Sequence, residues 1–113
     1  MKSAPRNYVV VLVTCSSRRE ALKIARRVVA LRQAACVNIL DVPVRSIHQW
    51  KGKMEEGHEI LLLMKSSRAR LAALQAEVER LHSYEVPEFI ALPIVAGSEK
   101  YLAWLGDCMH GKS

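Results

Sequence analysis

The segment 36–65 constrains the fold of this chain most strongly, because it predicts an unusually long β-hairpin. Its first arm, 36–50, contains Pro43, which cannot donate to a strand ladder and so predicts a bulge or a sheet edge. Lys51-Gly52 supplies the turn, and the second arm, 53–65, is polar near the turn and apolar at its far end. Two helices of ordinary length cannot cover the outer half of this hairpin, so we expect it to meet another subunit.

The remaining elements follow from turn and capping signals around this hairpin. The predicted order is strand 8–15, a helix from 17, strands 36–50 and 53–65, a helix ending near 82, strand 89–95 and a short C-terminal helix. Ser17 and Glu20 form an S-x-x-E capping box for the first helix. Ser66-Ser67 is expected to cap the second helix, and Gly97-Ser98 the last one.

This order, βαββαβ plus one helix, predicts an α+β fold of the ferredoxin-like plait type. Right-handed crossovers then give an antiparallel four-stranded sheet with both main helices on one face. The length suits a single domain over 1–113, with a core of about 8–105 and short flexible tails at both ends.

The net charge of +6 is concentrated near the N-terminus. Residues 1–32 hold eight basic side chains against Glu20 alone, which gives 8 − 1 = +7 and leaves −1 for the remainder. We expect a solvated basic helix face and no nucleic-acid partner, since the strand EILLLMK lacks the aromatic residues that stack on bases. No apolar run approaches the length of a membrane helix, so no membrane partner is expected.

Titratable residues offer two kinds of chemistry. Cys15 precedes a helix N-terminus, where the dipole favours a thiolate nucleophile, although a small buried cysteine is the simpler interpretation. His82 lies beside Tyr84 and Glu85 and is the strongest metal candidate among the four histidines, with a helix C-cap donor as its alternative role. Three cysteines without C-x-x-C spacing indicate reduced thiols and a cytoplasmic protein.

Six motifs, in chain order, resemble the CutA divalent-cation (copper) tolerance family. They are VVVLVTC before a helix, AACVNI, WKGKMEE, EILLLMKS, LHSYEVPEFIALPI and GSEKYLAWL. The match runs from about Tyr8 to Leu105, which is nearly the whole chain. The resemblance implies a non-enzymatic, cytoplasmic homotrimer with an architecture similar to PII signalling proteins.

The resemblance also implies a polar and aromatic pocket at the subunit boundary. The matching positions are Trp50, Glu59, Lys65 and Tyr84 for the pocket, with His82, Cys36 and Glu85 as candidate metal ligands. Copper or another divalent cation is the implied ligand, and no cofactor is required. Some family members for which copper binding is proposed have a cysteine at the position of Val13 and a second histidine at the position of Leu81. Of that set of ligands, this sequence contains only His82.

Three functions remain open from the sequence. The first is a divalent-cation tolerance or response protein with weak metal binding between subunits. The second is a PII-like sensor or signalling module that binds an anionic metabolite in the inter-subunit cleft through Lys65. The third is an enzyme that uses Cys15, which we expect the least because no relay of histidine and carboxylate accompanies it.

Overall fold

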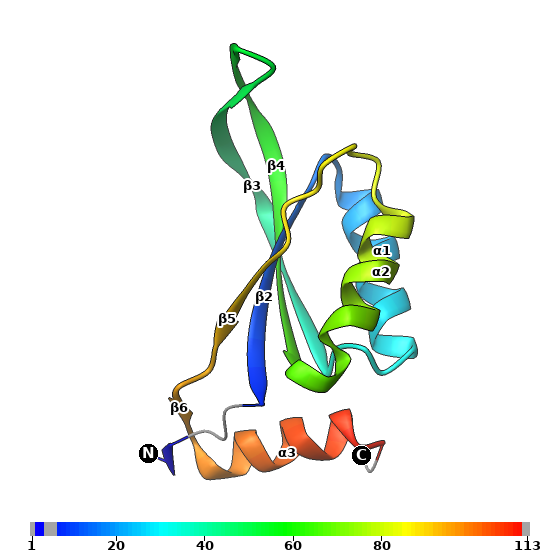
Figure 1. Ribbon diagram of the computed structural model, residues 1–113, viewed down its shortest axis with the longest axis vertical. Helices are drawn as coiled ribbons and strands as arrows, with labels where there is room; N and C mark the ends of the chain where they lie inside the picture. The colour runs from blue at the N-terminus through cyan, green and yellow to red at the C-terminus, as the bar shows by residue number, and fades with distance from the viewer. Residues whose placement is uncertain (1, 4–6, 112–113) are drawn as a thin grey trace.

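The computed structural model describes residues 2–3 and 7–111 and contains one main sheet with helices packed against it (Figure 1). The elements are β1 (Lys2–Ser3), β2 (Tyr8–Cys15), α1 (Arg18–Ala30), β3 (Cys36–Trp50), β4 (Lys53–Ser67), the 3-10 turn η1 (Arg68–Arg70), α2 (Leu71–Leu81), β5 (Ile90–Pro93), β6 (Ala96–Gly97) and α3 (Glu99–Met109). Four strands pair antiparallel in the order β3-β4-β2-β5, while β1 pairs with β6. The predicted βαββαβ order is therefore confirmed, and the short β1–β6 pair was not foreseen.

One face of the sheet is covered by α1 and α2, and the hydrophobic core lies between this face and the two helices. Alternate strand residues point to that face, because successive side chains of a strand point to opposite sides. The fully buried residues from the strands are Val11, Val13, Cys15, Leu62 and Met64, and those from the helices are Ala21, Ile24, Val28, Leu74 and Val78. Burying one large aliphatic side chain contributes roughly 1.5–3 kcal/mol, so this layer is the main source of stability.

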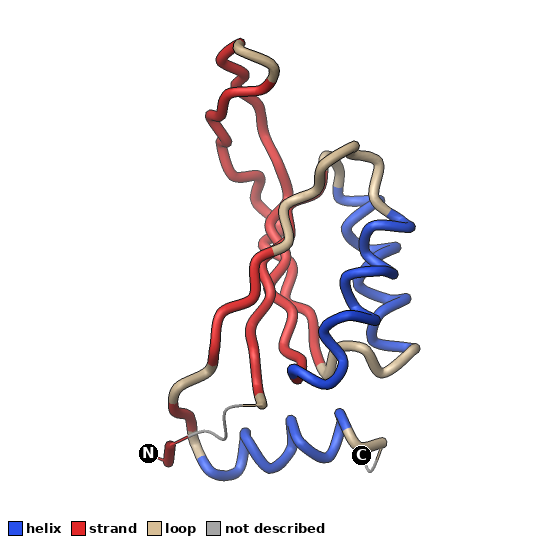
Figure 2. Tube along the Cα trace, in the orientation of Figure 1, coloured by secondary structure: helices blue, strands red, loops and turns tan. Residues whose placement is uncertain are grey.

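The opposite face of the sheet has no helix over it (Figure 2). It carries the aliphatic residues that alternate with the buried set, namely Val10, Leu12, Leu61, Leu63, Ile90 and Leu92. Ile90 and Leu92 keep 47% and 46% of their surface exposed in the single chain. We call these six residues the open sheet face.

The C-terminal helix α3 closes one end of the sheet (Figure 1). The side chain of Ser98 accepts a hydrogen bond from the Tyr101 amide, which confirms the predicted cap. Leu105 and Met109 are buried against Tyr8, so the packed chain extends past the expected core boundary at 105. The flexibility of the two tails stays a prediction, and residues 1, 4–6 and 112–113 lie outside the described residues.

The long hairpin is confirmed and projects beyond the helices (Figure 1). Lys51 and Gly52 both have positive φ, 51° and 80°, which is typical of a two-residue type I′ turn between Trp50 and Lys53. The pairing shifts register between Leu40 and Val44, where Pro43 predicted a bulge. The hairpin extends the chain to 44 Å along its longest axis, against 27 and 24 Å along the others.

Two local predictions were wrong. Ser66-Ser67 does not cap α2, because β4 continues through Ser67 and η1 intervenes before Leu71. The Ser66 hydroxyl instead donates to the Gln33 carbonyl oxygen at 2.6 Å, and a buried polar side chain needs such a partner. The last core strand is also shorter than 89–95, since only Ile90–Pro93 pairs with β2.

Candidate functional site

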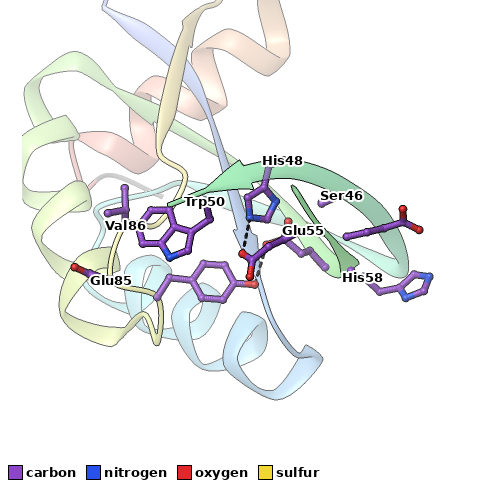
Figure 3. A pocket seen from close by; sticks show the side chains of 11 residues that line it. Ser46, His48, Trp50, Glu55, His58, Glu85 and Val86 are labelled. Carbon is purple, nitrogen blue, oxygen red and sulfur yellow. Dashed lines mark hydrogen bonds and ion pairs between the residues drawn. The ribbon is translucent and has the colours of Figure 1, made fainter. Parts of the chain in front are cut away.

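A pocket rich in polar side chains lies between the turn after α2 and the outer half of the hairpin, next to the hairpin turn. Its volume is about 450 Å³, and Figure 3 shows the side chains around it. The residues that line it are Ser46, His48, Trp50, Glu55, Glu56, Gly57, His58, Glu59, Tyr84, Glu85 and Val86. We call it the hairpin pocket.

The register of β3 and β4 brings the pocket residues together. His48 pairs with Glu55, and Ser46 pairs with Gly57. Directly paired residues point to the same side of a sheet, so Ser46, His48 and Glu55 share one face, whereas Glu56 and His58 occupy the alternate positions of β4. Gly57 carries no side chain, and a Cβ built there would meet nothing within 4 Å, which leaves the space opposite Ser46 open.

Glu59 is the best-defined charge in the pocket. Burial opposes its charged form, but the hydrogen bonds that it accepts from Ser46, Tyr84 and Thr14 together outweigh burial and hold its pKa below its ordinary value. The Tyr84 hydroxyl donates to Glu59 Oε2 at 2.8 Å. Burial first, and then this carboxylate, raise the pKa of Tyr84, so Tyr84 remains a neutral donor and Glu59 an anion.

His48 and Glu55 approach each other inside the pocket, with His48 Nε2 at 3.5 Å from Glu55 Oε1 (Figure 3). Two ligands that bind one tetrahedral ion at about 2.1 Å lie about 3.4 Å apart, so this spacing suits a shared cation. Glu59 lies close enough to His48 for their electrostatic interaction to contribute to the lowered pKa of Glu59. Four carboxylates line the pocket in all, which disfavours an anionic ligand within one chain.

A second cluster lies beneath the pocket and consists of Cys15, Glu20 and His82, whose potential ligand atoms all lie within 4.8 Å of one another. The Tyr84 amide donates to His82 Nδ1 at 3.1 Å. The other nitrogen, Nε2, lies 2.7 Å from the Thr14 carbonyl oxygen. Because an amide only donates and a carbonyl only accepts, the proton belongs on Nε2, and both ring nitrogens are occupied.

The other two members of this cluster are equally engaged. Glu20 accepts from the Ser83 amide at 2.6 Å and from the Ser83 hydroxyl at 3.2 Å. The predicted capping box is half formed, because the Ser17 hydroxyl accepts from the Glu20 amide. The Glu20 carboxylate does not return to Ser17 but connects α1 to the 82–84 turn. Burial, with Glu20 and Glu59 adding to it, raises the pKa of Cys15 to about 12, which keeps the thiol protonated. A protonated, fully buried thiol is a poor nucleophile.

The structure brings together some of the sequence-predicted residues and separates others. Trp50, Glu59, Tyr84 and Glu85 line the hairpin pocket, and the His82 ring lies 4.6 Å from the Tyr84 ring. Lys65 and Cys36 pair with each other elsewhere, with Lys65 Nζ at 4.0 Å from Cys36 Sγ. Lys65 lies six residues from Glu59 along β4, which is roughly 20 Å of strand. Within a single chain, Lys65 and Cys36 therefore cannot line the hairpin pocket together with Glu59.

The site predictions ranked His48 below His82 among the four candidate histidines and did not single out Glu55, although the sequence held a signal that places the two together. A two-residue turn at Lys51-Gly52 fixes Trp50 opposite Lys53, and counting back two residues along each arm places His48 opposite Glu55. The bulge lies farther from the turn than this pair, so it does not disturb the count.

The fold and the site define a class of protein: a small α+β chain whose described residues form an antiparallel sheet, three α-helices and an acidic pocket on the outer half of a long hairpin. Residues 9–108 match the family described as CutA1 divalent ion tolerance protein. The chain belongs to this family. In the part of the chain that the structure describes, no helix combines the length and the apolar character needed to cross a membrane.

Relatives at high identity support the assignment. A divalent-cation tolerance protein CutA from Thermus thermophilus is 46% identical over 98 residues, which is 87% of this chain and 94% of that protein. A solved structure of a Cut A1 protein from the same species has a TM-score of 0.84 at 44% identity, covering 87% of this chain and 94% of that one. A structure described as a periplasmic divalent cation tolerance protein from Archaeoglobus fulgidus has a TM-score of 0.86 at 33% identity, with 90% and 98% covered.

Several curated relatives are longer. A CutA homolog from Xenopus laevis is 45% identical over 95 residues, which is 84% of this chain and 62% of that protein. The chain likewise spans 56% of the human CutA protein and 53% of a chloroplastic one from Arabidopsis thaliana. Among the relatives named above, some names specify ion tolerance or a compartment, and none specifies a reaction.

Proposed function

We propose that this protein contributes to divalent-cation tolerance by binding a cation, copper among them, in the hairpin pocket, and that it does so without catalysing a reaction. The observation that carries the proposal is the convergence of His48 Nε2 and Glu55 Oε1, 3.5 Å apart, beside a Glu59 that hydrogen bonds hold in its charged form. Imidazole and carboxylate together suit copper and zinc. The family's association with divalent ions agrees with this ligand set.

We further propose that the protein acts as a homotrimer. The open sheet face supports self-association, because two of its residues, Ile90 and Leu92, remain about half exposed in one chain and exposed apolar patches mark contact surfaces. The projecting hairpin gives each chain an arm that can reach a neighbour. In such an assembly the pocket can gain residues from a second chain, and Lys65 and Cys36 can take part in it.

A cytoplasmic location stays part of the proposal. Cys15, Cys36 and Cys108 are all free thiols, which agrees with a reducing compartment. Relatives named as chloroplastic and periplasmic occur, so cell fractionation with a compartment marker is the direct test.

Native mass spectrometry during titration with Cu²⁺ tests both the subunit count and the uptake of ions. We expect a trimer that takes up ions in multiples of three, and we expect His48→Ala and Glu55→Gln to lose that uptake. His82→Ala separates the two sites, because the geometry of His82 predicts nearly unchanged uptake in that variant. His110→Ala, at an exposed position after α3, is the matched control.

Two results would overturn parts of the proposal. Unchanged uptake in His48→Ala together with loss in His82→Ala would move the metal site to the Cys15–Glu20–His82 cluster. A monomer at micromolar concentration would remove the assembly and leave the open sheet face unexplained.

A further inference from the structure

A second surface, formed by α1 and α2 alone, has the opposite charge to the hairpin pocket. A groove of about 740 Å³ runs between these helices on their outer side. It is lined by Arg19, Leu22, Lys23, Arg26, Arg27, Arg80 and Leu81, which are five cations and two leucines. We call it the helix groove, and nothing in the proposed cation binding uses it.

Part of this positive charge is compensated within the chain. Arg27 Nε lies 3.1 Å from Glu77 Oε2, and Arg80 Nε donates to Glu77 Oε1 at 3.1 Å. The hydrogen bond from Arg80, partly opposed by burial and supported by Arg27, lowers the pKa of Glu77 to about 2. One carboxylate thus pairs with two arginines, so this group of three side chains keeps a net positive charge.

The other three cations of the groove have no acidic partner within residues 7–111. Arg19, Lys23 and Arg26 are exposed and make no ion pair or side-chain hydrogen bond with any residue in the range 7–111. Their spacing, i, i+4 and i+7, puts them along one stripe of α1. Like charges at this spacing repel one another, so an anionic ligand would relieve a repulsion that the folded chain maintains.

The two leucines of the groove limit what that ligand can be. Leu22 and Leu81 are only half-buried and line the same groove as the cations. A nucleic acid would pair its phosphates with the rim but leave both leucines without an apolar partner, and the lining holds no aromatic residue for bases to stack on. A ligand that complements both features carries carboxylates together with an apolar stripe.

We propose that the helix groove binds an acidic amphipathic helical segment of a partner protein, with leucine-like side chains against Leu22 and Leu81 and carboxylates toward Arg19, Lys23 and Arg26. The α1 residues that line the groove run from Arg19 to Arg27, which is roughly 12 Å of helix, so a bound helix would contact it over about two turns. This binding is independent of the cation in the hairpin pocket.

Fluorescence anisotropy with a labelled synthetic peptide tests the proposal. The probe is an acetylated peptide of about 14 residues, made of Glu, Ala and Leu, whose leucines fall on one helical face. Comparison probes are a permuted peptide of the same composition without an apolar face, oligo-glutamate and a single-stranded RNA. All titrations contain EDTA, so the state of the hairpin pocket does not affect the result.

The matched variants carry the same change in net charge. Arg19→Glu/Arg26→Glu reverses two groove charges, whereas Lys53→Glu/Lys100→Glu reverses two exposed charges outside the groove. We expect the first variant to weaken peptide binding by about tenfold or more, because each reversal turns an attraction into a repulsion, and the second to have little effect. Leu22→Gln should weaken the amphipathic peptide but leave oligo-glutamate unchanged.

Each other outcome overturns the proposal. Equal loss in both double variants would show that only net charge matters. Equal binding of the permuted peptide would show that Leu22 and Leu81 take no part in recognition. Tighter binding of the RNA would assign the groove to a nucleic acid. Far-UV circular dichroism of each variant checks that α1 is intact, and Glu at position 19 suits the positive end of that helix.

Discussion

The hairpin pocket and the helix groove carry opposite charges and are built on different supports. Four glutamates line the pocket, which stands on strands that project beyond the helices. Five cations line the groove, which stands on helices whose inner sides form the core. The difference shows that one short chain carries an acidic surface and a basic surface. The basic groove lies over the core layer that stabilises the fold, whereas the acidic pocket lies on the projecting hairpin.

The largest effect expected concerns that supporting layer. Leu74, in α2, is fully buried, whereas Met54, near the hairpin turn, is 73% exposed. Leu74→Ala should lower the free energy of unfolding by about 2–5 kcal/mol, because it removes buried methyl groups and leaves a cavity. Met54→Ala should change it by less than about 0.5 kcal/mol. Urea denaturation of both variants measures this contrast, and similar losses would mean that the hairpin is as strongly packed as the core.

The next effect concerns the pH dependence of cation binding in the pocket. A proton competes with a cation for an imidazole nitrogen, so Cu²⁺ affinity should fall about tenfold between about pH 7.5 and pH 5.5. Glu59, with its lowered pKa, stays charged over this interval. Calorimetric titration at the two pH values gives the change, and His48→Ala should bind weakly and without the pH dependence. A wild-type affinity that is the same at both values would exclude an imidazole ligand.

A smaller effect is expected when the pocket loses one hydrogen bond. Tyr84→Phe removes the donor at 2.8 Å from Glu59, which should lower stability by about 1 kcal/mol and raise the pKa of Glu59. A carboxylate with a lowered pKa stabilises the fold above its unfolded pKa and loses that contribution as pH falls through its folded pKa. The deficit of Tyr84→Phe should therefore be present at neutral pH and shrink in acid. Denaturation curves at several pH values test this, and a deficit independent of pH would assign it to packing alone.

The smallest effect separates the causes of two lowered pKa values. Neutral hydroxyl groups supply the main hydrogen bonds to Glu59, whereas Arg80 and Arg27 hold the pKa of Glu77 at about 2. Salt screens the attraction between ionised groups, and both arginines are more than half exposed. High ionic strength should therefore raise the pKa of Glu77 by a few tenths of a unit and that of Glu59 by less. NMR titration of the side-chain carboxyl carbons at low and high salt provides the comparison. A larger salt response at Glu59 would contradict this account of the two regions.

Local sequence signals predicted much of this architecture. The turn at Lys51-Gly52, the bulge near Pro43 and the caps at Ser17 and Ser98 were all found where the signals placed them. Ser66-Ser67 misled the prediction because a serine pair before a helix also fits the buried end of a strand. A hydroxyl that finds a carbonyl partner across the fold has no local signature.

The candidate site was only partly predictable for the same reason. Trp50, Glu59 and Tyr84 were identified together through family motifs, and the structure places them in one pocket. His82 was predicted as a candidate metal ligand, but its ring donates to the Thr14 carbonyl oxygen and accepts from the Tyr84 amide. Thr14 lies 68 residues away, so the local sequence does not reveal this partner. The role of Glu20 in holding Ser83 likewise spans 63 residues.

The sequence by itself determined the order of the elements, the long hairpin, the family and the basic character of α1, because periodicity, turn residues and net charge are local properties of the chain. Only the tertiary structure decided which charges stand alone and which are paired. Strand register brought His48 to Glu55, and helix packing brought Glu77 to Arg27, while Arg19, Lys23 and Arg26 received no partner within residues 7–111. The state of a charge depends on its neighbours in space, and these are set by how the sheet and helices pack.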